Sequence, residues 1–490
     1  MSGGILASAK RLQQQLQSQS AVVIPDDVRA AMGYKPRELQ QKLDTTDRRF
    51  NVNVLHRRFG KTVRQVAKLI ERATLCPYPD GRFAYLAPTY SAAEDIAWLY
   101  LERYHGNLLR ACNRDPEPLQ KKGNLSVLVP TRAGHWARVR LYGVDSPKQR
   151  LRGLYLDGGV ADEWAQIPPS VWAQQVRPML SDKDRAGLDL AGNRTQWFDF
   201  IFTPFGRNHA HRMYTNATLW NRGQPVREID PLSEREHDVF SDEWSANLFK
   251  ASQTNLIDPR ELASARIDMG AAKYEQEYEC SFDAAVEGAV YARDIEELRT
   301  SGRINDFTVN PLLPVNTGWD LGYDDATAIW FWQEVAGEVR FVDYIELTGM
   351  SLERIVEKLA EKNYRYGYHL LPWDVEVGEL GTGKTRASIL KQLGVRVTVV
   401  PTHRVHDGIA AVQALLPISR FRDAATANGV DSLALYRREY IEENGVFREK
   451  AVHDRYSHGA DALRTVAMGR RRLRGEAGSG DPHAATMALL

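Results

Sequence analysis

From about residue 30 to about residue 285, short apolar segments alternate with longer segments whose apolar residues recur at helical spacing. This alternation is typical of an α/β fold built on a mainly parallel sheet. The apolar segments predict strands at 51–55, 83–87, 137–142, 159–161 and 197–202.

The order of the predicted elements changes after about residue 305. Strands in succession are expected within 317–332 and at 339–347, followed by a helix at 352–364, a strand at 369–373, another helix and a strand at 395–400. This order predicts a second, mixed α/β domain. We therefore expect an N-terminal arm (1–30), a first domain (31–290), a linker (291–304), a second domain (305–470) and a disordered tail (471–490).

Composition places few limits on function. The 490 residues are 43% hydrophobic and 26% charged, which indicates a soluble globular protein of about two domains. The formal net charge of +1 neither supports nor excludes a nucleic-acid partner, because an acidic centre can offset a basic groove. Three widely spaced cysteines, Cys76, Cys112 and Cys280, indicate reduced structural thiols. No apolar run reaches the roughly 18 residues of a membrane span, and we expect an intracellular protein with no membrane partner.

The segment Arg57-Arg58-Phe59-Gly60-Lys61-Thr62 has features of a phosphate-binding loop. It follows the predicted strand 51–55 and opens a helical segment. Backbone N–H groups at such a turn bind phosphate oxygens, Lys61 reaches the terminal phosphates, and the Thr62 hydroxyl ligates Mg²⁺. Leu55 stands where the motif usually has its first glycine, so the loop alone is equally compatible with a chance Gly-Lys-Thr.

Two adjacent carboxylates, Asp162 and Glu163, end the later strand 159–161, about a hundred residues after the loop. An Asp at a strand end can hold the hydration shell of Mg²⁺, and the following Glu can orient the attacking water. The combination favours nucleotide hydrolysis. Arg57 and Arg58 either supply positive charge to the phosphate or form a basic surface.

A second segment, 378–385, reads Gly-Glu-Leu-Gly-Thr-Gly-Lys-Thr and fits the formal phosphate-loop pattern better. No Asp-Glu strand end follows it, and residues 374–377 separate it from its strand. We interpret it as a flexible glycine-rich loop.

Three acids in the second domain suit a two-metal phosphodiesterase. Asp320 lies in the first strand, Asp374 at the end of a later strand, and Asp461 on a late helix, three residues after His458 and on the same face. Each acid also has an ordinary structural interpretation as a turn residue, a loop cap or a first-turn helix charge. Their order along the elements is typical of a ribonuclease-H-like nuclease. Asp324, Asp454 and His458 are further candidate metal ligands.

Taken together, these motifs resemble the large terminase subunit of tailed bacteriophages over about residues 30–470. Four further segments are similar to that family's second ATPase strand, the segment before its Asp-Glu strand, its coupling segment and its last nuclease motif. These segments are 83–89, 149–153, 201–209 and 458–464.

The resemblance implies ATP and Mg²⁺ as cofactors, with Mn²⁺ able to replace Mg²⁺ in the nuclease. It assigns the ATP-binding and Mg²⁺-binding residues as Arg58, Phe59, Gly60, Lys61, Thr62, Asp162 and Thr203. It further implies that Glu163 is the catalytic glutamate, that Thr203 couples hydrolysis to motion, and that Arg57 or Arg58 acts as an arginine finger. Asp320, Asp374 and Asp461 would be the nuclease metal ligands.

The function implied by the resemblance is ATP-driven translocation of double-stranded viral DNA into a procapsid, together with metal-dependent cleavage of concatemeric DNA. The implied partners are DNA, a portal protein, a small terminase subunit and further copies of this chain in a ring. The implied location is the host cytoplasm, with transient docking on the portal and absence from the mature virion. Two alternatives remain open: an ATP-dependent helicase with a fused nuclease, and a non-catalytic nucleotide-binding assembly factor.

Overall fold

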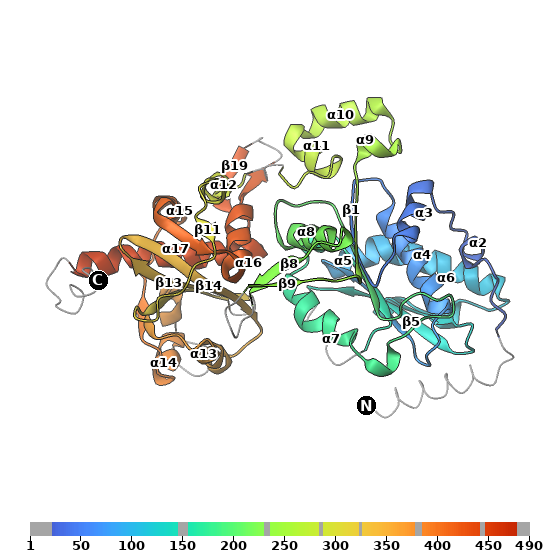
Figure 1. Ribbon diagram of the computed structural model, residues 1–490, viewed down its shortest axis with the longest axis horizontal. Coiled ribbons are helices and arrows are strands. Elements are labelled where there is room, and N and C mark those ends of the chain that lie inside the picture. Colours follow the sequence, from blue (N-terminus) through green and yellow to red (C-terminus); the bar gives the residue numbers. More distant parts are fainter. Residues whose placement is uncertain are drawn as a thin grey trace. The chain divides into compact units, whose positions relative to one another are not determined.

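The computed structural model describes residues 22–145, 155–229, 236–283, 288–322, 326–377, 385–441 and 446–477. The chain forms two compact units, which can be followed by colour in Figure 1. The first unit contains the chain up to Pro204 with Ala210–Asp268 and Tyr274–Cys280, and the second contains Phe205–His209, Met269–Lys273 and the chain from Ser281. Most of the predicted arm and tail, and the glycine-rich segment 378–384, lie outside the described residues.

The first unit is built on an eight-stranded sheet of order β10-β1-β7-β6-β2-β5-β4-β3. All neighbouring pairs from β10 to β5 are parallel, and β4 and β3 add antiparallel pairings at one edge. The strands are β1 (Phe50–Leu55), β2 (Arg82–Ala87), β3 (Gln120–Lys121), β4 (Ser126–Pro130), β5 (Trp136–Gly143), β6 (Gly158–Asp162), β7 (Trp197–Phe202) and β10 (Trp244–Phe249). Each strand predicted for this unit is present, whereas β3, β4 and β10 were not predicted.

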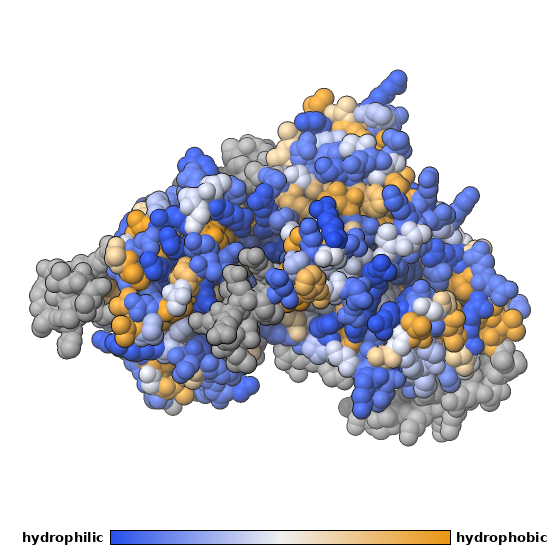
Figure 2. Space-filling view, in the orientation of Figure 1, coloured by the Kyte–Doolittle hydropathy of each residue, from blue (hydrophilic) through white to orange (hydrophobic). Residues whose placement is uncertain are grey.

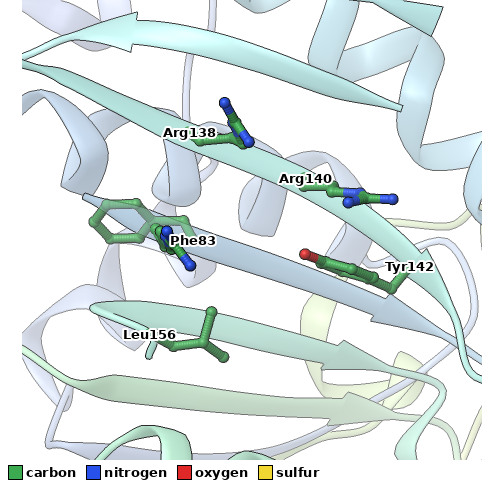
Figure 3. Close-up of a pocket in the computed structure, with 6 residues that line it drawn as sticks. Phe83, Arg138, Arg140, Tyr142 and Leu156 are labelled. Carbon is green, nitrogen blue, oxygen red and sulfur yellow. The ribbon is translucent and has the colours of Figure 1, made fainter. Parts of the chain in front are cut away.

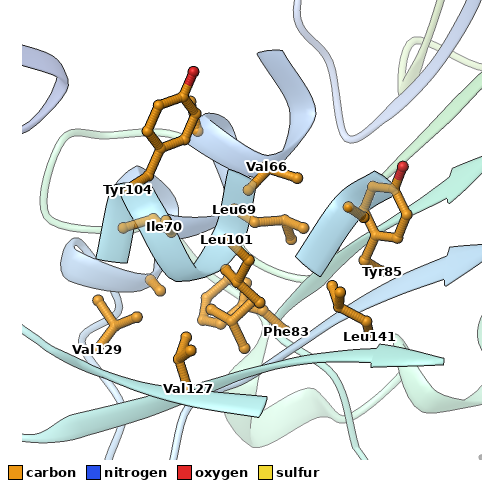
Figure 4. Packing of buried hydrophobic residues seen from close by; sticks show 14 of the residues in the cluster. Val66, Leu69, Ile70, Phe83, Tyr85, Leu101, Tyr104, Val127, Val129 and Leu141 are labelled. Carbon is orange, nitrogen blue, oxygen red and sulfur yellow. The ribbon is translucent and has the colours of Figure 1, made fainter. Parts of the chain in front are cut away.

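Helices α4 (Lys61–Thr74) and α6 (Leu99–Ala111) contribute to the main hydrophobic core of this sheet. In α4 the apolar residues Val66, Leu69, Ile70 and Ala73 recur at helical spacing and are fully buried. Figure 4 shows them packed over side chains from the strands, including Val127. Burial of each larger apolar side chain contributes roughly 1.5–3 kcal/mol to folding.

The helix α4 also carries charged residues that are buried against the sheet. Lys68 Nζ lies 2.8 Å from Asp199 Oδ2 on β7 and 2.6 Å from Asp47 Oδ2. Asp199 is fully buried and accepts a hydrogen bond from Asn51 Nδ2 on β1 at 2.7 Å. Burial by itself raises the pKa of Asp199, but the nearby cations Lys68 and Arg64 outweigh it and lower this pKa. The charges therefore tie α4 to the two strands that lead into the candidate site.

The second unit has a seven-stranded sheet of order β11-β17-β14-β13-β12-β15-β16. The first three long strands, β12, β13 and β14, pair antiparallel, and β15 and β16 then continue in parallel beyond β12. This order, third-second-first-fourth-fifth, is the ribonuclease-H-like arrangement. The strands are β11 (Ile304–Asn305), β12 (Val315–Leu321), β13 (Ala326–Val335), β14 (Glu338–Thr348), β15 (Tyr366–Leu371), β16 (Val397–Val399) and β17 (Ser419–Arg422).

Helices lie on both faces of this second sheet. One core contains Trp330 of β13 with residues of α15 (Val405–Leu415), α16 (Asp423–Leu435) and α17 (Arg455–Ala477). The other contains Trp319 of β12 with residues of α13 (Leu352–Glu361) and α14 (Arg386–Gln392). The predicted fold class, a mainly parallel P-loop unit followed by a ribonuclease-H-like mixed unit, is thereby confirmed.

The range 291–304, predicted as a linker, instead contains the helix α12 (Ala292–Thr300). Ile295 and Leu298 of this helix are buried in the core of the second unit. Their spacing places both on one face, which gives the segment an apolar surface to bury and explains why it folds onto the unit.

The remaining described helices and strands lie outside the two large sheets, and the pairs β8–β9 and β18–β19 each form a separate two-stranded antiparallel sheet. These are α2 (Val28–Met32), α3 (Glu38–Thr45), α5 (Tyr90–Ala92), α7 (Arg177–Met179), α8 (His209–Asn221), β8 (Val226–Ile229), β9 (Glu236–Val239), α9 (Ala251–Thr254), α10 (Pro259–Met269), α11 (Ala271–Glu277), β18 (Arg438–Ile441) and β19 (Val446–Ala451).

The surface and the cysteines fit the expectations from composition. Figure 2 shows a mainly hydrophilic face, and exposed large apolar residues such as Ile267 and Leu312 occur along the chain. All three cysteines are free and buried, and burial raises the pKa of Cys76 to about 11. Among the described helices, none combines the length and apolar character needed to cross a membrane.

Candidate functional site

The predicted phosphate loop lies between β1 and α4. Gly60 precedes the first residue of α4 with a φ of 86°, in the left-handed region that favours glycine. A Cβ at this position would also come within 2.9 Å of Gln40 Nε2. The side chain of Phe59 is fully buried and stacks on Phe249. This packing anchors the loop. The loop backbone therefore has the strand-to-helix geometry that phosphate binding requires.

Lys61 joins three parts of the candidate site. Its Nζ lies 2.6 Å from Glu163 Oε1 and 2.6 Å from Thr203 Oγ1. Burial by itself lowers the pKa of Lys61, but the carboxylates of Glu163 and Asp162 outweigh it and raise this pKa. Lys61 is therefore held in its charged form beside the loop.

The side chains of Thr62 and Asp162 are in direct contact. Thr62 Oγ1 donates a hydrogen bond to Asp162 Oδ2 at 2.9 Å, and the hydroxyl of Tyr85 on β2 donates to the same oxygen. Burial and the neighbouring Glu163 raise the pKa of Asp162, whereas Lys61 lowers it. A hydroxyl and a carboxylate at one point are the oxygen donors that Mg²⁺ prefers, so these residues fit a magnesium ion.

Tyr85 is a site residue that the sequence analysis missed. It lies opposite Val160 in the β2–β6 pairing, and alternation along β6 puts Val160 and Asp162 on the same face. The alternation along β6 could be predicted from the sequence, but the pairing of β2 with β6, which brings Tyr85 to Asp162, could not.

Glu163 follows β6 with a φ of 50°, which is uncommon for a residue other than glycine. Its Oε2 accepts the backbone N–H of Thr203 at 3.3 Å, while Oε1 lies against Lys61. A non-glycine residue in the left-handed region costs about 1–3 kcal/mol and is often found at functional sites. Glu163 has this left-handed backbone, and its carboxylate lies against Lys61 at the phosphate loop.

Thr203 follows β7, the strand between β1 and β6. Parallel neighbouring strands end at one edge of a sheet, and this brings Thr203 beside both the loop and Glu163. Besides its contact with Lys61, its hydroxyl donates to Leu55 O at 3.4 Å. Thr203, which the resemblance assigns as the coupling residue, is thus hydrogen-bonded to both Lys61 and Glu163.

Arg57 and Arg58 are both exposed, and Arg58 has a φ of 72°. The loop is instead supported by Gln40 of α3 and by Arg37, the residue that precedes this helix. Arg37 Nη1 donates to the carbonyl oxygens of Arg58 and Phe59 at 3.3 Å, and Gln40 Nε2 donates to those of Phe59 and Gly60 at 3.2 Å. Neither Arg37 nor Gln40 was singled out from the sequence, because a polar helix about twenty residues before the loop carries no motif.

In the second unit the structure brings together three of the predicted nuclease residues. His458 Nδ1 lies 3.0 Å from Asp320 Oδ2. Burial raises the pKa of Asp461 to about 6. The negative charge of Asp320 also raises this pKa, whereas Arg464, whose Nη2 lies 2.7 Å from Asp461 Oδ1, lowers it. The i, i+3 spacing in α17 therefore does place His458 and Asp461 beside the first strand.

Asp374 and Asp454 are placed differently. Asp374 lies in a 3-10 helix beyond β15 rather than at the strand end, and its Oδ2 is 3.5 Å from Arg386 Nη2. Asp454 pairs with Arg437 at 2.8 Å, and Asp324 lies outside the described residues. Within the described ranges, no three His, Cys, Asp or Glu side chains come close enough to hold one metal ion.

One carboxylate oxygen nevertheless fits a cation. Oδ1 of Asp374 is buried and has no hydrogen-bond donor among the described residues, whereas Oδ1 of Asp461 is ion-paired with Arg464 Nη2 at 2.7 Å. Buried carboxylate oxygens are normally satisfied by donors or by a metal. The acid residues on β12, after β15 and on α17 are therefore compatible with Mg²⁺ or Mn²⁺.

The strand order and these contacts define the class of protein. The first unit has a P-loop fold, with Lys61, Thr62 and the acid pair Asp162–Glu163 at the carboxyl edge of a mainly parallel sheet. The second is a ribonuclease-H-like unit with acids on its first strand and last helix.

Comparison with known proteins points to one group. The large terminase subunit of Thermus virus P23-45 is 28% identical over 230 residues, and that of Thermus phage G20c is 30% identical over 230 residues. Each match covers 44% of this chain and 44% of the relative, so it spans less than half the length of these proteins. No protein-family model matches the chain.

Solved structures similar to the chain include the large terminase ATPase domain of Thermus phage P74-26, at 24% identity and a TM-score of 0.40, covering 53% of this chain and 99% of that one. The large terminase of bacteriophage HK97 matches at 9% identity and a TM-score of 0.41, covering 89% of this chain and 94% of that one. The chain is a relative of the phage large terminase subunits, and the resemblance seen in its motifs is confirmed.

Proposed function

We propose that this chain is a DNA-packaging enzyme that hydrolyses ATP to move double-stranded viral DNA into a procapsid and cleaves concatemeric DNA. The observation that carries the proposal is the meeting of Lys61, Glu163 and Thr203 at one edge of the first sheet. A phosphate-binding cation, a carboxylate and a strand-end hydroxyl in mutual contact provide the groups that phosphoryl transfer to water needs.

In the proposed ATPase reaction, Lys61 and the loop backbone bind the phosphates and balance their negative charge. Glu163 orients the attacking water and accepts its proton. Thr62 and Asp162 would hold Mg²⁺, which would supply positive charge to the phosphate oxygens when bound. Because Thr203 contacts both Lys61 and Glu163, a change at the phosphates reaches the segment that follows β7 directly.

We assign the arginine finger to Arg57 or Arg58, because both are exposed on the loop and free to face a phosphate. The motor is assigned to residues 31–290. We propose that copies of the chain form a ring docked on a portal protein in the host cytoplasm, with a small terminase subunit selecting the DNA.

The nuclease is assigned to residues 305–470. Asp320, Asp374 and Asp461 would hold Mg²⁺ or Mn²⁺, which activates water and stabilises the leaving oxygen when bound. His458 positions the carboxylate of Asp320 through its 3.0 Å contact. The buried Oδ1 of Asp374, which has no donor among the described residues, supports this assignment.

The variant Glu163→Gln tests the motor. Nucleotide affinity should persist, because Lys61 and the loop remain, while the hydrolysis rate should fall about 10²–10⁴-fold with loss of the base. Glu102→Gln, at an exposed position on α6, is the matched control and should keep full activity. Unchanged hydrolysis in Glu163→Gln would refute the assigned base.

The variant Asp320→Ala tests the nuclease. We expect loss of Mn²⁺-dependent cleavage of supercoiled DNA and weaker Mn²⁺ binding by calorimetry, with ATP hydrolysis retained. Asp306→Ala, an exposed acid of the same unit, is the control. Full cleavage by Asp320→Ala would exclude the three-acid assignment.

A further inference from the structure

Three arginines on strands β2 and β5 line a pocket of about 190 Å³ in the first unit, together with Phe83, Tyr142 and Leu156. Arg138 and Arg140 are two residues apart on β5 and point to the same face of the sheet (Figure 3). Arg82 on β2 is the direct register partner of Arg138, so it belongs to that face as well. The strand pairing therefore gathers three positive charges in one place.

This face is opposite the one that builds the main core. The alternate residues of the same strands, Phe83 and Tyr85 on β2 and Val139 and Leu141 on β5, pack in the core with α4 and α6. Arg82, Arg138 and Arg140 lie on the other face and do not take part in that packing. The charges therefore call for a separate explanation.

No acid neutralises these charges among the described residues. The ion pairs of the described chain include none of the guanidinium groups of Arg82, Arg138 and Arg140. Asp157 lies close by, but both of its oxygens accept from Arg185 at 2.7 Å, and it meets Arg82 only through the backbone N–H. Three like charges held together without a counter-charge favour an anionic partner.

Aromatic rings fix two of the guanidinium groups. Arg82 lies over the Tyr155 ring at 4.4 Å, and Arg140 lies over the Tyr142 ring at 4.9 Å. Stacking of this kind orients the planar group and leaves its N–H edges for acceptors. The Nε of Arg140 is buried and has no hydrogen-bond partner among the described residues.

We propose that Arg82, Arg138 and Arg140 form a phosphate-backbone contact for duplex DNA. Two strand-spaced arginines lie roughly 6.6–6.8 Å apart along β5, and the third is offset to the neighbouring strand by roughly 4.8 Å. A linear polyanion can engage all three at once, whereas a single small anion can engage only part of the row. The proposal rests on the proposed DNA-handling function and names the surface that serves it.

The test is equilibrium binding of the full chain to a short fluorescent DNA duplex, in EDTA and without nucleotide, over a range of salt concentrations. Arg138→Ala and Arg140→Ala should each weaken binding about tenfold and lower the slope of log affinity against log salt by about one. Two duplexes of unrelated sequence should be affected equally, because phosphates carry no sequence information. Arg138→Lys should retain the salt slope, since it keeps the charge.

Arg103→Ala is the matched control. Arg103 is exposed like Arg138 and stacked on tyrosines (Tyr100 and Tyr104) like Arg82 and Arg140, but it lies on α6, which packs on the other face of the sheet. Its loss should leave DNA affinity unchanged. Affinity for a fluorescent ADP analogue confirms that each variant is folded at the nucleotide site.

The outcomes separate the two proposals. Wild-type affinity and salt slope in Arg138→Ala and Arg140→Ala would overturn the assigned surface, while DNA binding by the wild type would leave the packaging function standing. Variants that changed only self-association, measured by sedimentation, would also overturn it in favour of a protein contact. A wild-type chain that does not bind duplex DNA at all would refute the packaging function itself.

Discussion

The buried ion pair between Lys68 and Asp199 gives the sharpest prediction about what holds the nucleotide site together. Lys68→Met replaces a cation of 6% side-chain exposure with an apolar side chain of similar length, and it leaves Asp199, which is fully buried, without its nearest cation. Removing one partner of a buried pair typically costs 3–5 kcal/mol, because the remaining charge is not solvated. Arg64 Nη1 stays 3.8 Å from Asp199, so we expect a loss near the lower limit, about 3 kcal/mol.

The double variant Lys68→Met with Asp199→Asn distinguishes pairing from simple loss of packing. It removes both charges, so it should be more stable than the sum of the two single losses predicts, by about 2 kcal/mol. Hydrogen exchange of peptides from β1, α4 and β7 in increasing urea reports on this unit alone. Arg354→Met removes an exposed pair with Glu357 and should cost less than about 1 kcal/mol. Strictly additive losses in the double variant would show that the pair does not couple α4 to β7.

Two further predictions concern stability. Burial lowers the pKa of His105 from 6.5 to about 4. Between these two pH values the unfolded chain binds a proton on His105 that the folded unit does not bind. The free energy of unfolding is therefore highest above pH 6.5 and falls as the pH drops towards 4, by at most about 3 kcal/mol. In urea unfolding at pH 5 and pH 7, His105→Gln should reduce this difference and exposed His135→Gln should not; an unchanged pH dependence in His105→Gln would contradict the assignment. Gly318 has no room for a Cβ because Val466 of α17 lies against it, so Gly318→Ala should destabilise the second unit by about 1–3 kcal/mol, seen as a lower Tm. Gly123→Ala, where a Cβ meets nothing within 4 Å, should leave Tm unchanged, and equal Tm values for the two variants would refute the packing argument.

The local elements were accessible from the sequence because their signals are local. The strand before Arg57, the glycine that starts α4 and the Asp-Glu pair after β6 each combine a hydrophobic period with a turn or an end residue. The sequence did not predict the contact of Lys61 with Glu163, which arises in the structure because the parallel strands end at a common edge.

The tertiary structure decided which distant segments become neighbours. The pairing of β10 with β1, the contact of Tyr85 with Asp162 and the contact of His458 with Asp320 all depend on tertiary packing, which no local pattern encodes. The same holds for the arginines of β2 and β5, whose charges meet only through the register of two strands more than fifty residues apart. Periodicity fixes which face a residue occupies within its own element, whereas long-range packing selects the element it faces.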